Sequence, residues 1–569
     1  MGLDKEIAVQ RAKILSHEKH TTDLLTRWED DYDLLTLEKY QIPAEEGEWE
    51  NYTTNSPATL GYSIMGALGE ARRKLWIPQS DEKSKERDAL SKTEQLAIGA
   101  IQMADWEIIQ IPEAIDIQSE LSFYSPIRGW CILRCYLEED GGKLKVHIAA
   151  WDPLNTQWIA GKNGASWVNY QRFATLAQLK DEYGNDKITA SEDSQGRILV
   201  NNAFDETETG TWVGDKWVDG PKEHGQDHVP VLILPVGSIP FIQSQRRTNT
   251  IKDLGESIYA KNRHIYPIES RLHSYELTRA GQSAKMPTVV EYDSSKAPLP
   301  PEIEKDPYVK GRTILLDAAK GQTLKKFLEQ PSNQDILQMQ AFTANQVSMG
   351  GMAPIAFGQN NQAIPAAGID MLTDSARQTL KPYKKNIEMC FAWLAEEIVR
   401  QYKNGDYKAN VFEGDDKSGK RFHAEIEPKD IEDNWHFQCE LKLNLLRDEV
   451  GKMGLAVQST KAGILSKQTA REKYADVDDT NLEQGIIDRE DAELITQKKA
   501  WDMARALFED GDKTGAQIII NTIMAGAGIS PSGPTGGPAS TAEAELAAEQ
   551  STTKGNLAEQ AQNLSSRRA

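Results

Sequence analysis

Residues 331–402 read PSNQDILQMQAFTANQVSMGGMAPIAFGQNNQAIPAAGIDMLTDSARQTLKPYKKNIEMCFAWLAEEIVRQY. Two segments with helical composition, Pro331–Met349 and Ile369–Tyr402, flank a loop rich in glycine, proline and amide side chains. The second segment has an apolar residue at every third or fourth position, which places one apolar face along a helix. The members of this face are Ile369, Leu372, Ala376, Leu380, Tyr383, Ile387, Cys390, Leu394, Ile398 and Tyr402. Pro382 removes a backbone hydrogen bond, so the pattern predicts one long helix kinked at Pro382.

The rest of the chain alternates between helical and strand-like blocks, which predicts an α+β protein. The blocks are a mainly helical region 1–120 that includes a helix over Ser91–Ile109; a strand-rich region 129–237; a helical region 244–283 that bends at Pro267; strand-like runs at 288–292 and 312–316; strands within 408–445; and short helices within 460–508. Residues 526–541 are rich in glycine, serine and proline and are expected to be flexible. Residues 543–564 have little apolar surface, so we expect them to be disordered or marginally helical.

The composition narrows the class of protein. The chain of 569 residues has room for three or four domains. Its best candidate for an apolar span, residues 229–242, is short and interrupted by prolines, so it predicts a buried strand and no membrane segment. The charged N-terminus lacks the apolar core of a signal peptide, so we expect the protein in a cytoplasm when it is made.

Cysteines and histidines do not predict a metal site. The four cysteines, at 131, 135, 390 and 439, are too few for a disulfide framework. Cys131 and Cys135 would share one face of a strand without further ligands nearby, so we expect buried free thiols. His17 and His20 lie one helical turn apart but lack an evident third ligand, so we interpret them as part of a solvated helix face.

The formal net charge of −21, without an evident basic patch, argues against tight binding of nucleic acid through its phosphates. Two interpretations of the acidity stay open. It keeps a large protein soluble, or it suits a channel in which DNA must slide without strong phosphate contacts.

The nearest match to a nucleotide-binding loop is Gly414–Arg421, with the sequence GDDKSGKR. A Walker A loop needs Ser or Thr after its lysine, whereas Arg421 follows Lys420 here. Two aspartates would also repel phosphates, and the following residues alternate like a strand where the motif requires a helix. We therefore interpret the loop as a hairpin turn. Since no GxSxG element is present either, we expect a protein that is not an enzyme and needs no cofactor.

Five elements in a fixed order between residues 250 and 480 resemble the tailed-bacteriophage portal proteins, which form head-to-tail connector rings. Asp253–Tyr259, before a long helix, resembles the Gly-x-Ser element that opens the first stem region. Val309–Leu316 with Gly321–Leu324 resembles the strand pair of the clip. Met352–Gly358 resembles the turn after the second stem helix, 369–402 the long wing helix, and Gly463–Ala470 a start-of-helix element of the C-terminal part. The order and spacing of these elements carry the resemblance.

The resemblance implies a portal-like α+β fold made of a mixed wing, two stem helices, a small clip and a helical crown. Its implied parts are the wing, 1–245 and 369–470; the first stem helix region, 246–285; the clip, 286–330; the second stem helix, 331–352; a tunnel loop, 353–368; the crown, 471–528; and a flexible tail, 529–569. The tunnel loop would offer uncharged hydrogen-bonding groups to DNA from Gln359, Asn360, Asn361 and Gln362, although an ordinary surface loop is the alternative. The clip would face the packaging motor with Lys296, Glu302, Lys305 and Lys310.

The function implied by the resemblance is that of a homo-oligomeric ring, by family precedent a dodecamer, at one capsid vertex of the virion. It would assemble in the host cytoplasm beside the major capsid and scaffolding proteins, away from any membrane. Double-stranded DNA would pass through it during packaging and ejection. The ring would dock the terminase large subunit first and head-completion, adaptor or tail proteins later. The alternatives are a nucleotide-dependent enzyme that uses residues 414–421, and another virion structural protein such as an adaptor.

Overall fold

The computed structural model describes most of the chain up to residue 461 and parts of the remainder. The described residues are 3–43, 45, 49–78, 90–140, 143–162, 164–184, 192–237, 239–241, 251–284, 288–293, 295, 313–320, 334–351, 366–405, 407–415, 421–431, 435–443, 456–461, single positions and short runs between 463 and 508, and 513–526. The chain divides into two compact units, Met1–Leu465 and Ser466–Ala569. Among the described residues, no helix is both long and apolar enough to cross a membrane. The fold is mixed, with helices and several separate sheets, as the α+β prediction has it.

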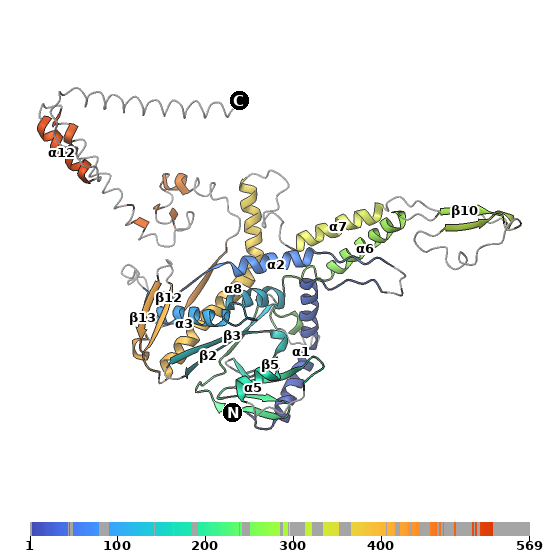
Figure 1. The fold of residues 1–569 in the computed structure, drawn as a ribbon, viewed down its shortest axis with the longest axis horizontal. Helices are drawn as coiled ribbons and strands as arrows, with labels where there is room; N and C mark the ends of the chain where they lie inside the picture. The colour runs from blue at the N-terminus through green and yellow to red at the C-terminus, as the bar shows by residue number, and fades with distance from the viewer. Residues whose placement is uncertain are drawn as a thin grey trace. The chain divides into compact units, whose positions relative to one another are not determined.

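Helix α8 (Ala366–Asn404) lies at the centre of the core of the first unit (Figure 1). It confirms the predicted long amphipathic helix. Its side chains at Ile387, Phe391 and Leu394 are completely buried, and the helix packs against strand β2 (Trp130–Asp140) and strand β14 (Gln438–Lys442). Burying a large apolar side chain stabilises a fold by about 1.5 to 3 kcal/mol, so this face is a major source of stability.

The start of α8 corrects one predicted boundary. The helix begins at Ala366, so the last three residues of the loop predicted over 353–368 belong to the helix. Pro382 lies inside α8, and the helix continues on both sides of it. The kink predicted at Pro382 stays a prediction.

The described residues of the N-terminal region form four α-helices and one strand. The helices are α1 (Ile7–Thr36), α2 (Ser56–Gly69), α3 (Lys92–Ile109) and α4 (Ile117–Phe123). Helix α3 begins after a capping box, in which the Ser91 hydroxyl accepts from the Glu94 N–H and the Glu94 carboxylate accepts from the Ser91 N–H. The mainly helical prediction missed strand β1 (Arg72–Trp76), which pairs antiparallel with β14. Its partner lies more than 360 residues later in the sequence, so no local pattern could have indicated the pairing.

Two antiparallel sheets confirm the predicted strand-rich region. One has the order β3-β2-β9, with β3 at Lys143–Trp151 and β9 at Val231–Pro235. The other has the order β4-β5-β6-β7-β8, and its strands are Thr156–Ala160, Ala165–Thr175, Arg197–Asp205, Glu208–Val213 and Lys216–Glu223. Helix α5 (Leu176–Tyr183) follows β5. An apolar cluster that includes Ile132, Trp151, Val168 and Phe204 joins β2 and β3 to β5 and β6.

Helix α6 (Ile265–Ala284) and helix α7 (Gln334–Gly350) lie side by side (Figure 1). Between them in the sequence, strands β10 (Thr288–Tyr292) and β11 (Thr313–Asp317) pair in parallel, which confirms the two strand-like runs. The helix predicted over 244–283 starts only at Ile265. Pro267 is therefore in the first turn, where a proline costs no hydrogen bond and need not bend the helix.

Strands β12 (Asn410–Asp415) and β13 (Arg421–Ile426) form an antiparallel hairpin in which Asp415 is paired with Arg421. This pairing confirms the interpretation of 414–421 as a hairpin, and residues 416–420 of its turn lie outside the described residues. In the second unit, α12 (Lys513–Gly526) is the longest described helix. The predicted tail, 529–569, lies outside the described residues.

The predictions for cysteine and histidine had different outcomes. Cys131, Cys135 and Cys390 are buried free thiols, and Cys439 is partly buried. The solvated interpretation of the helix face at His17 was wrong, because His17 is buried and packs against Trp158 with ring centroids 4.4 Å apart. Burial lowers the pKa of His17 to about 4. His20 is exposed, as that interpretation has it, whereas His17 belongs to the buried face of α1 with Ile14, Thr21 and Leu24.

Candidate functional site: an anchored pair of helices

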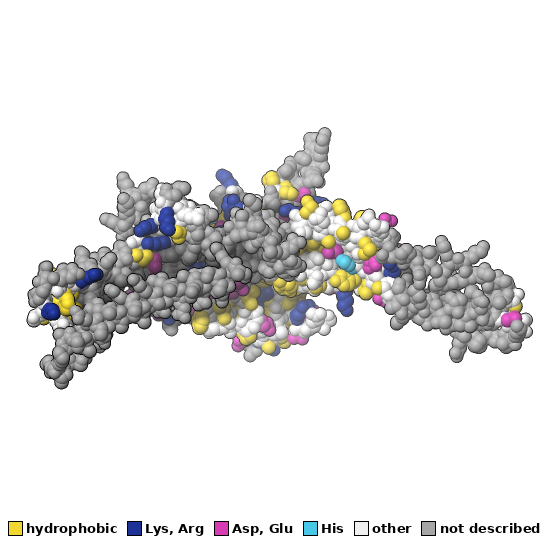
Figure 2. Space-filling view, turned by 90° about the horizontal axis from the view of Figure 1, so that it is seen from above, with side chains coloured by type: hydrophobic (Ala, Val, Ile, Leu, Met, Phe, Trp, Pro, Cys, Tyr) yellow, Lys and Arg dark blue, Asp and Glu magenta, His cyan; other side chains and the backbone are white. Residues whose placement is uncertain are grey.

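The pair α6–α7 is the candidate functional site, because these helices are exposed although they carry many apolar and few charged side chains. Of the 17 residues in α7, the one fully buried residue is Thr343, and the one charged residue is Asp335. The helix exposes Leu337, Met339, Phe342 and Met349, and α6 adds exposed Ile268 and Leu277. Figure 2 shows hydrophobic side chains exposed on one face of the described residues, with scattered charged side chains among them. Charged residues are depleted and methionine is enriched at the centres of protein interfaces, so α7 has the composition of an interface.

Helix α6 is held along its length by an extended segment, residues 49–54, through a row of hydroxyl groups. The backbone N–H groups of Glu50, Tyr52 and Thr54 donate to the hydroxyls of Thr278, Ser274 and Ser270, at 2.8, 2.9 and 3.2 Å. Two residues of extended chain span about 6.8 Å, and four residues of helix rise about 6 Å, so the two periods nearly match. Every second backbone N–H of the segment therefore donates to a hydroxyl group on α6.

The junction between the helix pair and the rest of the first unit is built around two arginines. Arg263, just before α6, forms a two-point ion pair with the buried Asp31 of α1, with Nε and Nη2 at 2.7 and 2.9 Å from the carboxylate oxygens. Arg27 of α1 donates to the carbonyl oxygens of Lys252, Leu254 and Gly255. Glu256 lies within ion-pair distance of both guanidinium groups.

Burial lowers the pKa of both arginines, but the neighbouring carboxylates outweigh burial in only one of them. Burial alone would lower the pKa of Arg263, but its hydrogen bond and ion pair with Asp31 outweigh burial and raise it. Burial lowers the pKa of Arg27 despite the nearby carboxylates of Glu256 and Asp31. Removing one partner of such a buried group leaves an uncompensated charge, so this network is expected to be sensitive to substitution.

Two glycines let the backbone cross at the same junction. Gly129 and Gly255 both have positive φ, 73° and 64°, and a Cβ on Gly129 would lie 1.8 Å from the carbonyl oxygen of Gly255. Only glycine permits both the left-handed conformation and this approach. Ser257 accepts from Arg263 and from the N–H of Tyr259. The Gly-x-Ser element singled out in the sequence is thus the crossing point from which α6 departs.

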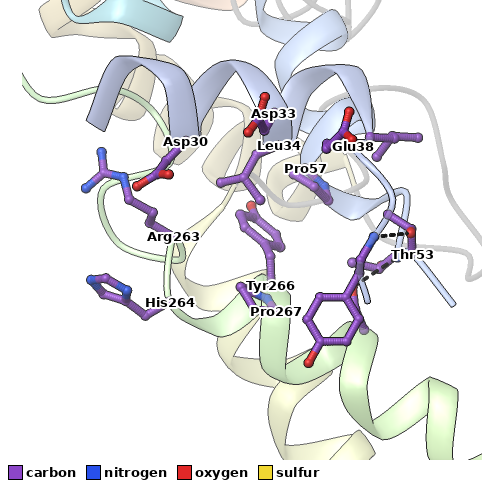
Figure 3. A pocket seen from close by; sticks show the side chains of 14 residues that line it. Asp30, Asp33, Leu34, Glu38, Thr53, Pro57, Arg263, His264, Tyr266 and Pro267 are labelled. Carbon is purple, nitrogen blue, oxygen red and sulfur yellow. Dashed lines mark hydrogen bonds between the residues drawn. The ribbon is translucent and has the colours of Figure 1, made fainter. Parts of the chain in front are cut away.

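A pocket of about 310 Å³ lies beside this junction, between the end of α1 and the start of α6 (Figure 3). Carboxylates of Asp30, Asp33 and Glu38 line it together with His264 and Tyr266. Burial raises the pKa of Asp30, and the neighbouring charge of Asp31 raises it further. Within the described part of the chain, no group of side chains has the arrangement of a metal site.

The structure brings together few of the residues that the sequence singled out. Gln359, Asn360, Asn361 and Gln362 of the predicted tunnel loop lie outside the described residues, and so do Lys296, Glu302, Lys305 and Lys310 of the predicted clip. The hydroxyl row at 270, 274 and 278 was missed, although its spacing of four is visible in the sequence. The pair Arg263–Asp31 was also missed, since 232 residues separate its members.

Comparisons with known proteins add little. Neither the known protein families nor the curated proteins include a match to this sequence. Among solved structures, the chain is similar to one from "Neck of native GTA particle computed with C12 symmetry", with 12% identity over 74% of this chain and 89% of that chain and a TM-score of 0.37. It is also similar to one from "Neck of empty GTA particle computed with C6 symmetry", with 12% identity over 74% of this chain and 90% of that chain and a TM-score of 0.38. Likenesses at these values carry no argument about function.

Proposed function

We propose that this protein is a subunit of a viral portal ring, with α6 and α7 as the stem helices that contact neighbouring copies. One observation carries the proposal. Helix α7 is exposed along most of its length, yet it has a single charged residue and four exposed large apolar ones. Such a face loses free energy in water and gains it against another apolar surface. The ordered series between residues 250 and 480, which resembles portal proteins, supports the same function.

In this proposal, identical subunits contact one another head to tail, which closes into a ring when the rotation per subunit divides a full turn. Double-stranded DNA would pass through the ring at a capsid vertex during packaging and ejection. Residues 359–362 would touch the DNA with uncharged amides. Such groups neutralise no phosphate and displace no counterion from the DNA, so each contact would break easily. The residues of 286–330 would dock the terminase and later the head-completion or tail proteins. Energy for transport would come from the motor, so the ring itself would be no enzyme.

The first test is the native mass of the purified full-length chain by mass photometry, with a negative-stain image of the same sample. The expected particle is a closed ring near twelve times 63.5 kDa with a central hole. A sample that remains monomeric under all assembly conditions, without any channel in images, would overturn the proposal.

Two matched variants connect the ring to α7. Phe342 and Leu15 are equally exposed, at 57%, but Leu15 lies on the charge-rich α1. Replacing Phe342 by Asp should raise the concentration needed for ring assembly at least about tenfold, since a central apolar anchor is worth 2 kcal/mol or more. Replacing Leu15 by Asp should leave assembly unchanged. Equal effects of the two variants would show that α7 is not part of the interface between subunits.

The enzyme alternative is weaker. The β12–β13 hairpin places an antiparallel strand where a phosphate-binding loop needs a helix N-terminus. Lys420→Ala should therefore leave ATP binding at background and ring formation unchanged. Loss of a measurable ATPase in that variant would favour the enzyme instead.

A further inference from the structure

The space between the two antiparallel sheets is apolar in one part and polar in another. One part is filled by the apolar cluster of Ile132, Trp151, Val168 and Phe204. Beyond Trp151 and Phe204 the sheets enclose a cleft of about 690 Å³. Its walls are charged and polar side chains from β2, β3, β5 and β8 and from α5. An apolar core therefore gives way to a polar cleft within one sandwich of sheets.

Most charges in this cleft are matched. Arg172 donates to Glu182 at 3.1 Å, Lys222 lies 2.9 Å from Asp219, and His147 lies 3.5 Å from Glu138. Each basic side chain in these pairs thus has its own carboxylate. The pairs of Arg172 and Lys222 add no net charge when ionised, whereas burial lowers the pKa of His147 and favours its neutral form.

Arg134 is the exception. It lies on β2 with its guanidinium carbon 5.9 Å from the centre of the Trp151 ring. Its side chain has no hydrogen bond or ion pair with any described residue, and its buried Nε has no partner. Burial lowers the pKa of Arg134, and the largest opposing effects come from Cys135 and Tyr183 rather than from a carboxylate. A partly buried guanidinium without an anion is costly, because its charge is partly desolvated and its buried Nε donor has no acceptor.

Three tyrosines line the same cleft as Arg134; Tyr183 is hydrogen-bonded to Arg172, and the other two are Tyr136 and Tyr170. Tyr136 is on the same face of β2, and Tyr170 stacks on the other side of the cluster against Trp151, with ring centroids 4.7 Å apart. Neither hydroxyl has a hydrogen-bond partner among the described residues. Burial raises the pKa of both hydroxyls, that of Tyr170 to about 12, so both stay protonated donors at neutral pH.

We propose that this cleft binds a carboxylate group through Arg134, with Tyr136 and Tyr170 as additional hydrogen-bond donors. A carboxylate matches the planar guanidinium with two parallel hydrogen bonds. Glu138, Glu182 and Asp219 also line the cleft, so every further negative charge on the ligand is unfavourable and a monoanion is preferred to a dianion. The cleft is far larger than a carboxylate alone, so the group belongs to a larger molecule, either a small organic acid or an acidic side chain of another polypeptide. This site is independent of the ring proposed above.

The test is calorimetric titration of the full-length protein at constant ionic strength, with chloride as the background anion. The probes are acetate, glutamate blocked at both its amino and α-carboxyl groups, and inorganic phosphate. We expect saturable binding of at least one carboxylate probe, and we expect Arg134→Met to weaken it at least tenfold. The matched control is Arg197→Met. Arg197 lies on β6 outside the cleft and pairs with Asp193, so its loss should leave binding unchanged.

Folding of the variant has its own readout. Because Arg134→Met removes an uncompensated cation, the thermal midpoint of the variant in chloride should equal or exceed that of the natural protein. Tighter binding of blocked glutamate than of acetate would assign the source as a protein side chain, and the reverse order would assign a small acid. Absence of saturable binding by either carboxylate, equal binding by the Arg134→Met variant, or tighter binding of phosphate would overturn the proposal.

Discussion

Helices α7 and α8 are neighbours in the sequence, yet the apolar face of α8 is buried and large apolar side chains of α7 are exposed. From Leu380 to Tyr402, α8 has its apolar face buried against strands and helices of the same chain. Helix α7 packs against α6, and its side chains Phe342 and Met349 are exposed. Both sequences contain apolar residues at helical spacing. The difference is therefore whether the chain itself supplies the second surface.

The comparison extends from single helices to the regions that hold them. The core around α8 is stabilised by many buried apolar contacts. The α6–α7 pair joins that core at its base through Tyr266 and Val347, and polar contacts also hold it, namely the Arg263–Asp31 pair and the hydroxyl row along α6. A helix pair fixed in this way keeps its outer faces available, which is what an interface between copies requires.

The largest expected difference comes from two equivalent substitutions, Phe391→Ala on α8 and Phe342→Ala on α7. Phe391 is completely buried and Phe342 is 57% exposed. We expect Phe391→Ala to lower the free energy of unfolding by about 3 to 5 kcal/mol, because it leaves a cavity. Phe342→Ala should change it by less than about 0.5 kcal/mol in the dissociated subunit. Urea denaturation of dilute protein measures both, and equal losses would erase the contrast between the helices.

The next effect concerns the base of the helix pair. Asp31→Asn should lower the free energy of unfolding by about 3 kcal/mol, because Arg263 and Arg27 lose a buried counter-charge. Its neighbour Asp30 faces the pocket instead and has a raised pKa caused by burial. Asp30→Asn should therefore be neutral or slightly stabilising. The pair of variants is compared by thermal unfolding at pH 7, and a larger loss for Asp30→Asn would contradict the assigned network.

A smaller effect on the α8 side depends on pH. The buried carboxylate of Glu397 on α8 lies 3.0 Å from His228 Nε2, and this hydrogen bond raises the pKa of His228 despite burial. A raised folded pKa means that the stabilisation is complete below the ordinary value of 6.5 and is lost as pH rises through the raised value. We expect a loss of about 1 to 2 kcal/mol over that window. In His228→Gln, this pH-dependent part of the free energy of unfolding should be absent between pH 6 and 9. If the variant shows the same pH dependence as the natural protein, the contribution of the His228–Glu397 contact is contradicted.

The smallest effect concerns the hydroxyl row. Ser274→Ala leaves the N–H of Tyr52 without its acceptor, so we expect a loss of about 1 kcal/mol and faster hydrogen exchange at Tyr52. Thr22→Ala on α1 is the control, since its hydroxyl bonds only to the carbonyl of Glu18 in the same helix. It should stay within about 0.5 kcal/mol of the natural protein. Unchanged exchange at Tyr52 in Ser274→Ala would show that the segment is held by other contacts.

The sequence by itself determined the elements that local periodicity controls. The apolar spacing of 369–402 predicted α8, alternation predicted the strands of 129–237, and the polar turn at 414–421 predicted the β12–β13 hairpin. These predictions succeed because backbone geometry sets the spacing of side chains on a helix or strand, whatever lies opposite. For the same reason, the spacing cannot say whether the opposite surface is water, this chain or another copy.

Only the tertiary structure decided which distant groups meet. Arg263 and Asp31 are 232 residues apart, and the hydroxyl of Ser274 meets the N–H of Tyr52 across 222 residues. Arg134, one of many arginines in the sequence, becomes distinctive only because the fold places it in a cleft where no described side chain forms an ion pair with it. Charges interact through space over a few ångströms, and the fold, not the order of residues, sets those distances.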